Sequence, residues 1–177
     1  MDERAEAAKS ILESDVFKQR GYRPLVKAGL ERGLQKIHTP FDLCHQIIAK
    51  LAESVDLKSQ QIAVLFNLEF VVVLVEDFGV KPSQITFFAD SLSEEMAAKH
   101  WYKLHNLHRI DYNATAKERI TLVPQIKKKF DVIIMNPPYQ GTSGNKGVGH
   151  TLWGNFVNLS LDMLKNNAYL CAVHPAG

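Results

Sequence analysis

The residues best suited to chemistry are Asn136-Pro137-Pro138-Tyr139, which directly follow the apolar stretch 130–135. Two successive prolines remove two backbone donors and restrict the chain, so we expect the carbonyl groups of this turn to face outward as acceptors. The side chain of Asn136 adds a further carbonyl, and together these groups can accept both hydrogens of an exocyclic amine. Because the ring of Tyr139 can stack on a flat base, the tetrapeptide predicts a site for the amino group of a planar heterocycle. A plain turn after a strand is the alternative interpretation of a Pro-Pro pair.

Glycines and lysines form two less specific patterns. Four of the ten glycines lie within residues 141–149, around Lys146, and this loop is either a lid that touches the ligand or phosphate or a simple connector. A separate basic run is usually the solvated end of a helix, but it could also contact DNA phosphates. The run consists of Lys127, Lys128 and Lys129.

No combination of residues predicts a metal site. The histidines at 100, 105 and 108 have a metal-like spacing, but no cysteine or acid completes the set. The two cysteines, Cys44 and Cys171, are far apart and are expected to be buried apolar residues, which is typical of a cytoplasmic protein.

Alternating strands and helices must position the tetrapeptide. Apolar segments predict strands at 62–66, 85–89, 107–110, 130–135 and 168–173. Helices are predicted at 40–51, 69–78, 92–104, 117–128 and 152–164, of which 69–78 is expected to be a buried helix that ends before Gly79. This alternation predicts an α/β fold with a mostly parallel sheet of about five strands and helices on both faces. In such folds ligands bind at the carboxyl ends of the strands, where the tetrapeptide lies.

The chain divides into an N-terminal helical extension, residues 1–35, and the α/β domain, residues 36–177. At the start of the domain, Thr39 is expected to be the N-cap of a helix, with Pro40 at its first position and Asp42 as the acid of a capping box. The fifth strand would be left as an edge, which could pair with a second chain or with a further part of the protein.

The tetrapeptide and its surroundings resemble the S-adenosylmethionine-dependent N6-adenine DNA methyltransferases, whose catalytic motif is Asp/Asn/Ser-Pro-Pro-Tyr/Phe. The resemblance covers roughly residues 36–177 and implies a Rossmann-like methyltransferase core. It implies that Thr39 and Pro40 lie near the methionine end of the cofactor, that Asp90 binds the ribose, and that Asp111 lies near the cofactor adenine. In the family, the cofactor-binding loop after the first strand is acidic and rich in glycine. Here the loop has no glycine, and Asn67 and Glu69 are its polar residues.

The resemblance also implies a mechanism. The target adenine leaves the DNA stack and lies against Tyr139, while Asn136 and the carbonyl of Pro137 bind its amine. The nitrogen lone pair then attacks the methyl group in line, with no metal and no general base. The expected partner is DNA, in a phage or restriction-modification setting.

A net charge of +2 gives no general attraction to nucleic acid, and the longest apolar run, residues 70–75, is too short to span a membrane.

Two other functions stay open. The missing glycines would fit an inactive methyltransferase-like domain that binds nucleic acid or protein. Asn-Pro-Pro-Tyr also occurs in enzymes that methylate RNA bases or protein glutamine.

Overall fold

The computed structural model describes residues 39–89, 92–109, 128–137 and 153–174. Several predictions fall outside these ranges, including the helical extension at 1–35, the helix at 117–128 apart from Lys128, and the glycine-rich loop at 141–149. Within the described ranges, no helix is both long enough and apolar enough to cross a membrane.

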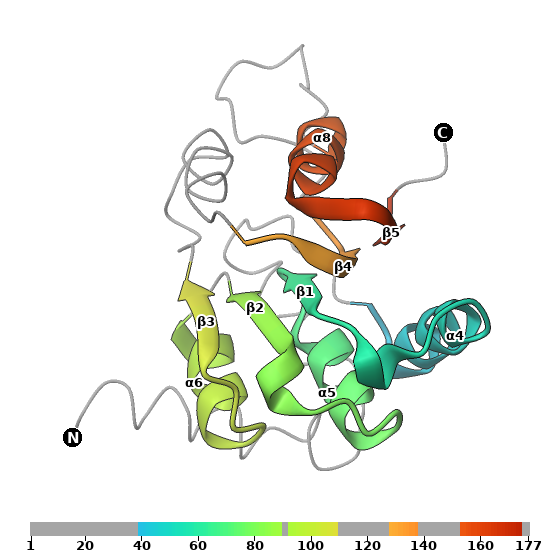
Figure 1. Cartoon of the computed structure of the whole chain (residues 1–177). Coiled ribbons are helices and arrows are strands. Elements are labelled where there is room, and N and C mark those ends of the chain that lie inside the picture. Colours follow the sequence, from blue (N-terminus) through green and yellow to red (C-terminus); the bar gives the residue numbers. More distant parts are fainter. Residues whose placement is uncertain (1–38, 90–91, 110–127, 138–152, 175–177) are drawn as a thin grey trace, which may run out of the picture.

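Five parallel strands form one sheet in the order β3-β2-β1-β4-β5 (Figure 1). The chain therefore runs from the centre to one edge, returns, and completes the other half of the sheet. This arrangement confirms the predicted α/β fold with a parallel sheet of about five strands. The strands are β1 (Ile62–Leu65), β2 (Ile85–Ala89), β3 (Asn106–Arg109), β4 (Phe130–Met135) and β5 (Leu164–Ala172).

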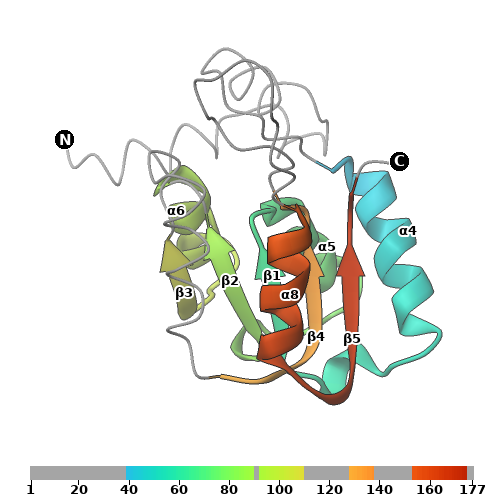
Figure 2. The ribbon, with the colours of Figure 1, turned by 90° about the horizontal axis from the view of Figure 1, so that it is seen from above.

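Helices cover both faces of the sheet. Figures 1 and 2 show α5 and α6 against one face and α8 against the other, with α4 beside α5. The helices are α4 (Phe41–Ala52), α5 (Leu68–Glu76), α6 (Leu92–His100) and α8 (Trp153–Met163), and two short 3₁₀ turns are η1 (Leu57–Ser59) and η2 (Pro82–Gln84).

Side-chain alternation along the central strands builds two apolar layers. In β1, Ile62 and Val64 pack with α4, α5 and α6, whereas Ala63 and Leu65 pack with α8. All four residues are fully buried, which explains why the strand has a continuous apolar sequence rather than an alternating one. The same two-sided burial holds for β4, so the residues at its end have a rigid base.

Some predicted boundaries were wrong. The final strand starts at Leu164 rather than at 168, and it contains an irregularity: Asn167 has φ 60°, and the register with β4 shifts there. The helix expected to extend to residue 104 ends at His100. Lys128, the last residue of the helix expected at 117–128, belongs to neither a helix nor a strand.

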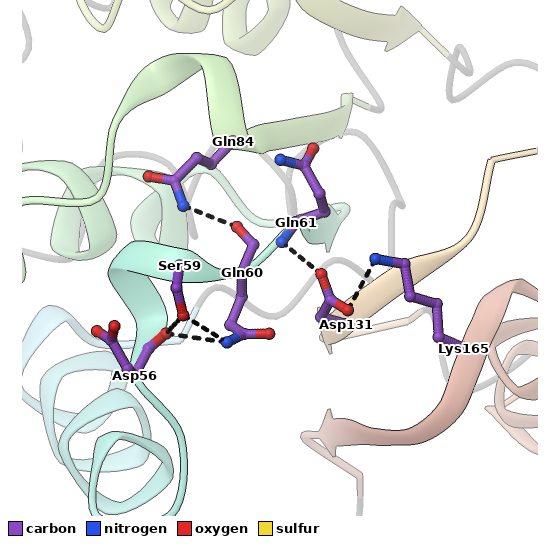
Figure 3. A network of polar contacts seen from close by, with 7 residues as sticks. All are labelled: Asp56, Ser59, Gln60, Gln61, Gln84, Asp131 and Lys165. Atoms are coloured by element: carbon purple, nitrogen blue, oxygen red, sulfur yellow. Dashed lines mark hydrogen bonds and ion pairs between the residues drawn. The ribbon is translucent and has the colours of Figure 1, made fainter.

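A polar network connects residues at the amino ends of the strands (Figure 3). The Asp131 carboxylate accepts the backbone N–H of Gln61 at 2.8 Å and pairs with the Lys165 ammonium at 2.8 Å. The Gln84 amide donates to the carbonyl oxygens of Lys58 and Gln60. These contacts join the entries to β1, β2, β4 and β5 at the edge opposite the tetrapeptide.

Candidate active site

The carboxyl edge of the sheet contains the point where the direction of strand order reverses. The chain proceeds from β1 through β2 to β3 on one side, and β4 returns to pair with the other side of β1. In open α/β sheets a crevice forms at this point. Asn67 follows β1 and Asn136 follows β4, so both lie beside this reversal.

Three polar side chains meet there, and we refer to Thr39, Asn67 and Asn136 as the Thr39 cluster. The Asn136 amide nitrogen donates to the Thr39 hydroxyl oxygen at 3.1 Å, and the Asn67 amide nitrogen donates to the same oxygen at 3.5 Å. All three residues are buried. Thr39, which precedes α4, therefore contacts the residues that follow two central strands, β1 and β4.

Thr39 does not have the role expected from its position before a helix. The N-cap of α4 is Pro40, and no side chain caps the helix. The Thr39 hydroxyl is instead occupied by the two asparagines, while its carbonyl oxygen accepts the Cys44 thiol at 3.6 Å. Asp42, at the position of a capping-box acid, lies in the first turn, but no capping box is formed.

Asn136 is more enclosed than the outward-facing turn predicted from the prolines. It is 7% exposed, Pro137 is buried, and the Asn136 backbone N–H extends the pairing with β1 by donating to the Leu65 carbonyl. The physical reason is the Thr39 segment, which packs over the end of β4. Pro138 and Tyr139 lie outside the described residues, so the expected stacking of a base on the tyrosine ring stays a prediction.

The turn between β1 and α5 contains a feature that the sequence did not reveal. Phe66 has φ 66°, a left-handed conformation that is uncommon for a bulky residue. Its N–H donates to the Phe88 carbonyl at 2.9 Å, and its ring packs edge-on against Phe156 at 5.3 Å between centroids. Phe66 thus makes the left-handed turn for which glycine is the usual residue.

Asn67 and Glu69 begin α5. Asn67 is the N-cap residue, but its side chain makes no capping bond, and its Oδ1 atom is buried without a hydrogen-bond partner among the described residues. Glu69, in the first turn, is 1% exposed. Burial, together with the nearby Glu69 charge, raises the pKa of the Cys44 thiol, so this cysteine is not an activated nucleophile.

The remaining predicted site residues are spread more widely. Pro40 is exposed at the start of α4. Lys128 and Lys129 precede β4, at the opposite end of that strand from Asn136; Lys128 donates to the Thr86 hydroxyl, and Lys129 donates to the Asp162 carbonyl. Six strand residues span about 20 Å, so these lysines lie far from the Thr39 cluster. Asp90, Asp111, Lys127 and Lys146 lie outside the described residues.

No metal site is present within the described residues, where no three His, Cys, Asp or Glu side chains gather as potential ligands. His108 packs against Phe88, and burial, together with the Lys128 charge, lowers the pKa of its ring. The expectation that the protein uses no metal stays a prediction.

Comparison with protein families gives one match. The model described as "Eco57I restriction-modification methylase" matches residues 80–177, more than half of the chain. No curated protein matches the chain.

Solved structures of similar fold include proteins from two microorganisms. Thermoplasma acidophilum 1320 has a TM-score of 0.47 at 16% identity, covering 68% of this chain and 56% of that one. The SAM-dependent methyltransferase from Agrobacterium tumefaciens has a TM-score of 0.46 at 15% identity, covering 78% and 46%. A third structure, SMU.776 complexed with SAH, has a TM-score of 0.47 at 14% identity, covering 72% and 34%. The chain thus spans between 34% and 56% of the length of these proteins.

Proposed function

Because the chain belongs to the Eco57I restriction-modification methylase family, we propose that it transfers the methyl group of S-adenosylmethionine to the N6 amine of a flipped adenine in DNA. The observation that carries the proposal is the position of Asn136, which follows a central parallel strand at the reversal of strand order. Its side-chain amide nitrogen donates a hydrogen bond to the Thr39 hydroxyl. A rigid acceptor at this edge is what an exocyclic amine requires.

The chemistry of the amide supports an amine as substrate. In the proposed complex, the Asn136 side-chain oxygen and the Pro137 carbonyl accept the two amine hydrogens, and the adenine ring stacks on Tyr139. These hydrogen bonds favour a tetrahedral nitrogen with an accessible lone pair. Catalysis by this chain is then a matter of orientation and of placing dipoles, without a general base.

The residues around Asn67 fit the methionine end of S-adenosylmethionine. The Asn67 Oδ1 atom is a buried acceptor without a partner among the described residues, and the ammonium group of the cofactor is a suitable donor for it. The α5 N-terminus lacks a side-chain cap, and its N–H groups suit the carboxylate. In this proposal Asp90 binds the ribose hydroxyls and Asp111 lies near the adenine ring. The bound cofactor supplies an electrophilic methyl group on a sulfonium centre.

Contacts with the DNA backbone form a separate part of the proposal. Lys127, Lys128, Lys129 and Lys146 are candidates for phosphate contacts, and each such contact would make binding weaker as salt increases. Because Lys128 and Lys129 precede β4, their contribution would be to DNA affinity rather than to the methyl-transfer step.

The test compares binding with transfer in one pair of variants. We expect isothermal titration to detect S-adenosylmethionine binding to the chain, and labelled methyl groups to appear on DNA adenine. Asn136→Ala should abolish transfer while leaving cofactor affinity unchanged, because the lost contact is with the amine of the substrate. Asn106→Ala, at the amino end of β3, is the matched control and should retain both properties.

Three outcomes would contradict the proposal. Loss of cofactor affinity in Asn136→Ala would mean that the two sites are wrongly placed. Methyl transfer to RNA or to protein glutamine would replace the proposed substrate. Cofactor binding to the wild-type chain without any transfer, or no binding at all, would favour a methyltransferase-like binding module.

A further inference from the structure

We propose that Thr39 is a positioning residue that fixes the orientation of the Asn136 side-chain amide for the substrate amine. This inference rests on the function proposed above, because it assigns Thr39 a role in that same reaction. It starts from the finding that the Thr39 hydroxyl, 2% exposed, is used by Asn136 rather than by the helix it precedes.

The orientation of an asparagine amide is not fixed by its own torsions. Rotation about χ2 is broad, and the two ends of the amide differ, one being a donor and the other an acceptor. With Nδ2 held by Thr39 at 3.1 Å, Oδ1 lies on the opposite branch and is turned away from the threonine. In this arrangement Thr39 faces the donor end of the amide, and the acceptor end is presented elsewhere.

The choice of end matters for an amine substrate. An exocyclic amine offers two hydrogens, so it requires an acceptor facing it. An amide rotated by half a turn would place its own NH₂ group against the amine, and two donors would face one another. Holding Nδ2 on the threonine side thus favours the arrangement that can bind the amine and disfavours the one that cannot.

Asn67 strengthens the assignment because it uses the same oxygen. Its amide nitrogen lies 3.5 Å from the Thr39 oxygen, and a hydroxyl oxygen has two acceptor positions. The two asparagines therefore occupy both acceptor positions of Thr39. The segment before α4 is in this way tied to the residue after β1 and to the residue after β4.

The decisive variants change the hydroxyl and little else. Thr39→Val has a similar shape without the hydroxyl, and we expect it to lower the rate constant of methyl transfer at saturating substrate about 100-fold, the loss typical of a misplaced catalytic group. KM for DNA should stay unchanged, because the DNA contacts proposed above involve other residues. Thr39→Ser, which keeps the hydroxyl, should restore the rate. Thr86→Val removes another buried threonine hydroxyl, 1% exposed in β2, and should leave the rate unchanged.

A second measurement reads the hydrogen bond without any reaction. In NMR spectra of the ¹⁵N-labelled chain, the Asn136 side-chain NH₂ protons, assigned by their absence in Asn136→Ala, should exchange slowly with solvent in the wild type and in Thr39→Ser. They should exchange faster in Thr39→Val.

The two readouts separate the possible failures. A Thr39→Val chain that folds normally and transfers methyl groups at the wild-type rate would overturn the role of Thr39. Equal exchange of the Asn136 amide in the wild type and in Thr39→Val would overturn it as well. If the wild-type chain transfers no methyl group to DNA, the proposed function fails, and the exchange measurement still decides whether Thr39 holds the amide.

Discussion

Asn67 is fully buried at the carboxyl ends of the strands, and its Oδ1 atom has no hydrogen-bond partner among the described residues. An unsatisfied buried polar atom costs about 1–3 kcal/mol. The long 3.5 Å contact to Thr39 offsets little of this cost. Residues that reduce stability in this way are common where a ligand must bind, which agrees with the cofactor contact proposed for Asn67.

We therefore expect Asn67→Ala to separate stability from binding. The free energy of unfolding should change by less than about 1 kcal/mol, whereas affinity for S-adenosylmethionine should fall roughly 10- to 100-fold through the loss of a hydrogen bond to a charged group. Urea denaturation and calorimetric titration measure the two quantities. Gln60→Ala, at the amino edge, is the control for binding. A large loss of stability with unchanged affinity would show that Asn67 is a structural residue.

At the scale of elements, the turn from β1 to α5 shows how a methyltransferase-like loop can form without glycine. Phe66 adopts the left-handed conformation at φ 66°, which costs a residue with a Cβ atom about 1–2 kcal/mol. Burial of its ring to 2% exposure and the contact with Phe156 offset that cost. The turn is thus stabilised through its side chain rather than through backbone freedom.

A pair of substitutions tests this account of the turn. Phe66→Gly and Phe66→Ala both remove the ring and should both destabilise the protein by several kcal/mol, about 3–5 for the alanine variant. The glycine variant should be the more stable of the two by about 1 kcal/mol, because only glycine adopts this conformation without strain. At Phe87, buried in β2 and absent from the positive-φ residues, the order should be reversed. Chemical denaturation of the four variants measures both differences.

The elements themselves could be predicted where the sequence pattern is local. The strands at 85–89 and 130–135 were predicted at their observed bounds, because continuous apolar runs end there at polar or turn residues. The start of β5 was missed because Asn166 and Asn167 are typical of a turn, and pairing with β4 overrides that preference. The bond between Thr39 and Asn136 joins residues 97 positions apart, and no local pattern distinguishes it from a helix cap.

At the scale of the whole molecule, Asp131 connects both halves of the sheet. It binds the N–H of Gln61 at the start of β1 and the ammonium of Lys165 in β5 (Figure 3). Partial burial acts to raise the pKa of the Asp131 carboxyl, but hydrogen bonds from Lys165 and Gln61, together with the Lys165 charge, outweigh it and lower the pKa below its usual value of 3.8. The ionised form is thus the one that stabilises the fold.

The expected pH dependence follows from the direction of this shift. Above the unfolded-state pKa, Asp131→Asn should be less stable than the wild type, by about 1 kcal/mol or less because the pair is partly exposed. As the pH falls below about 3.8 and through the lower folded-state pKa, the wild type loses this contribution and the difference should disappear. Denaturation curves at several pH values measure it. Asp162→Asn, an exposed carboxylate at the end of α8, is the control. A difference that stays constant with pH would contradict the assignment.

The central position of β1 also has a consequence for biosynthesis. Its two neighbours in the sheet are β2, which follows within about twenty residues, and β4, which begins only at Phe130. On the ribosome, a chain that has emerged as far as β3 can pair only one side of β1, and its other side presents unsatisfied backbone groups. Until β4 has been synthesised, the nascent protein is open to aggregation through the unpaired side of β1. In the folded protein β4 pairs with that side, and Asn67 and Asn136 lie at the ends of these two strands.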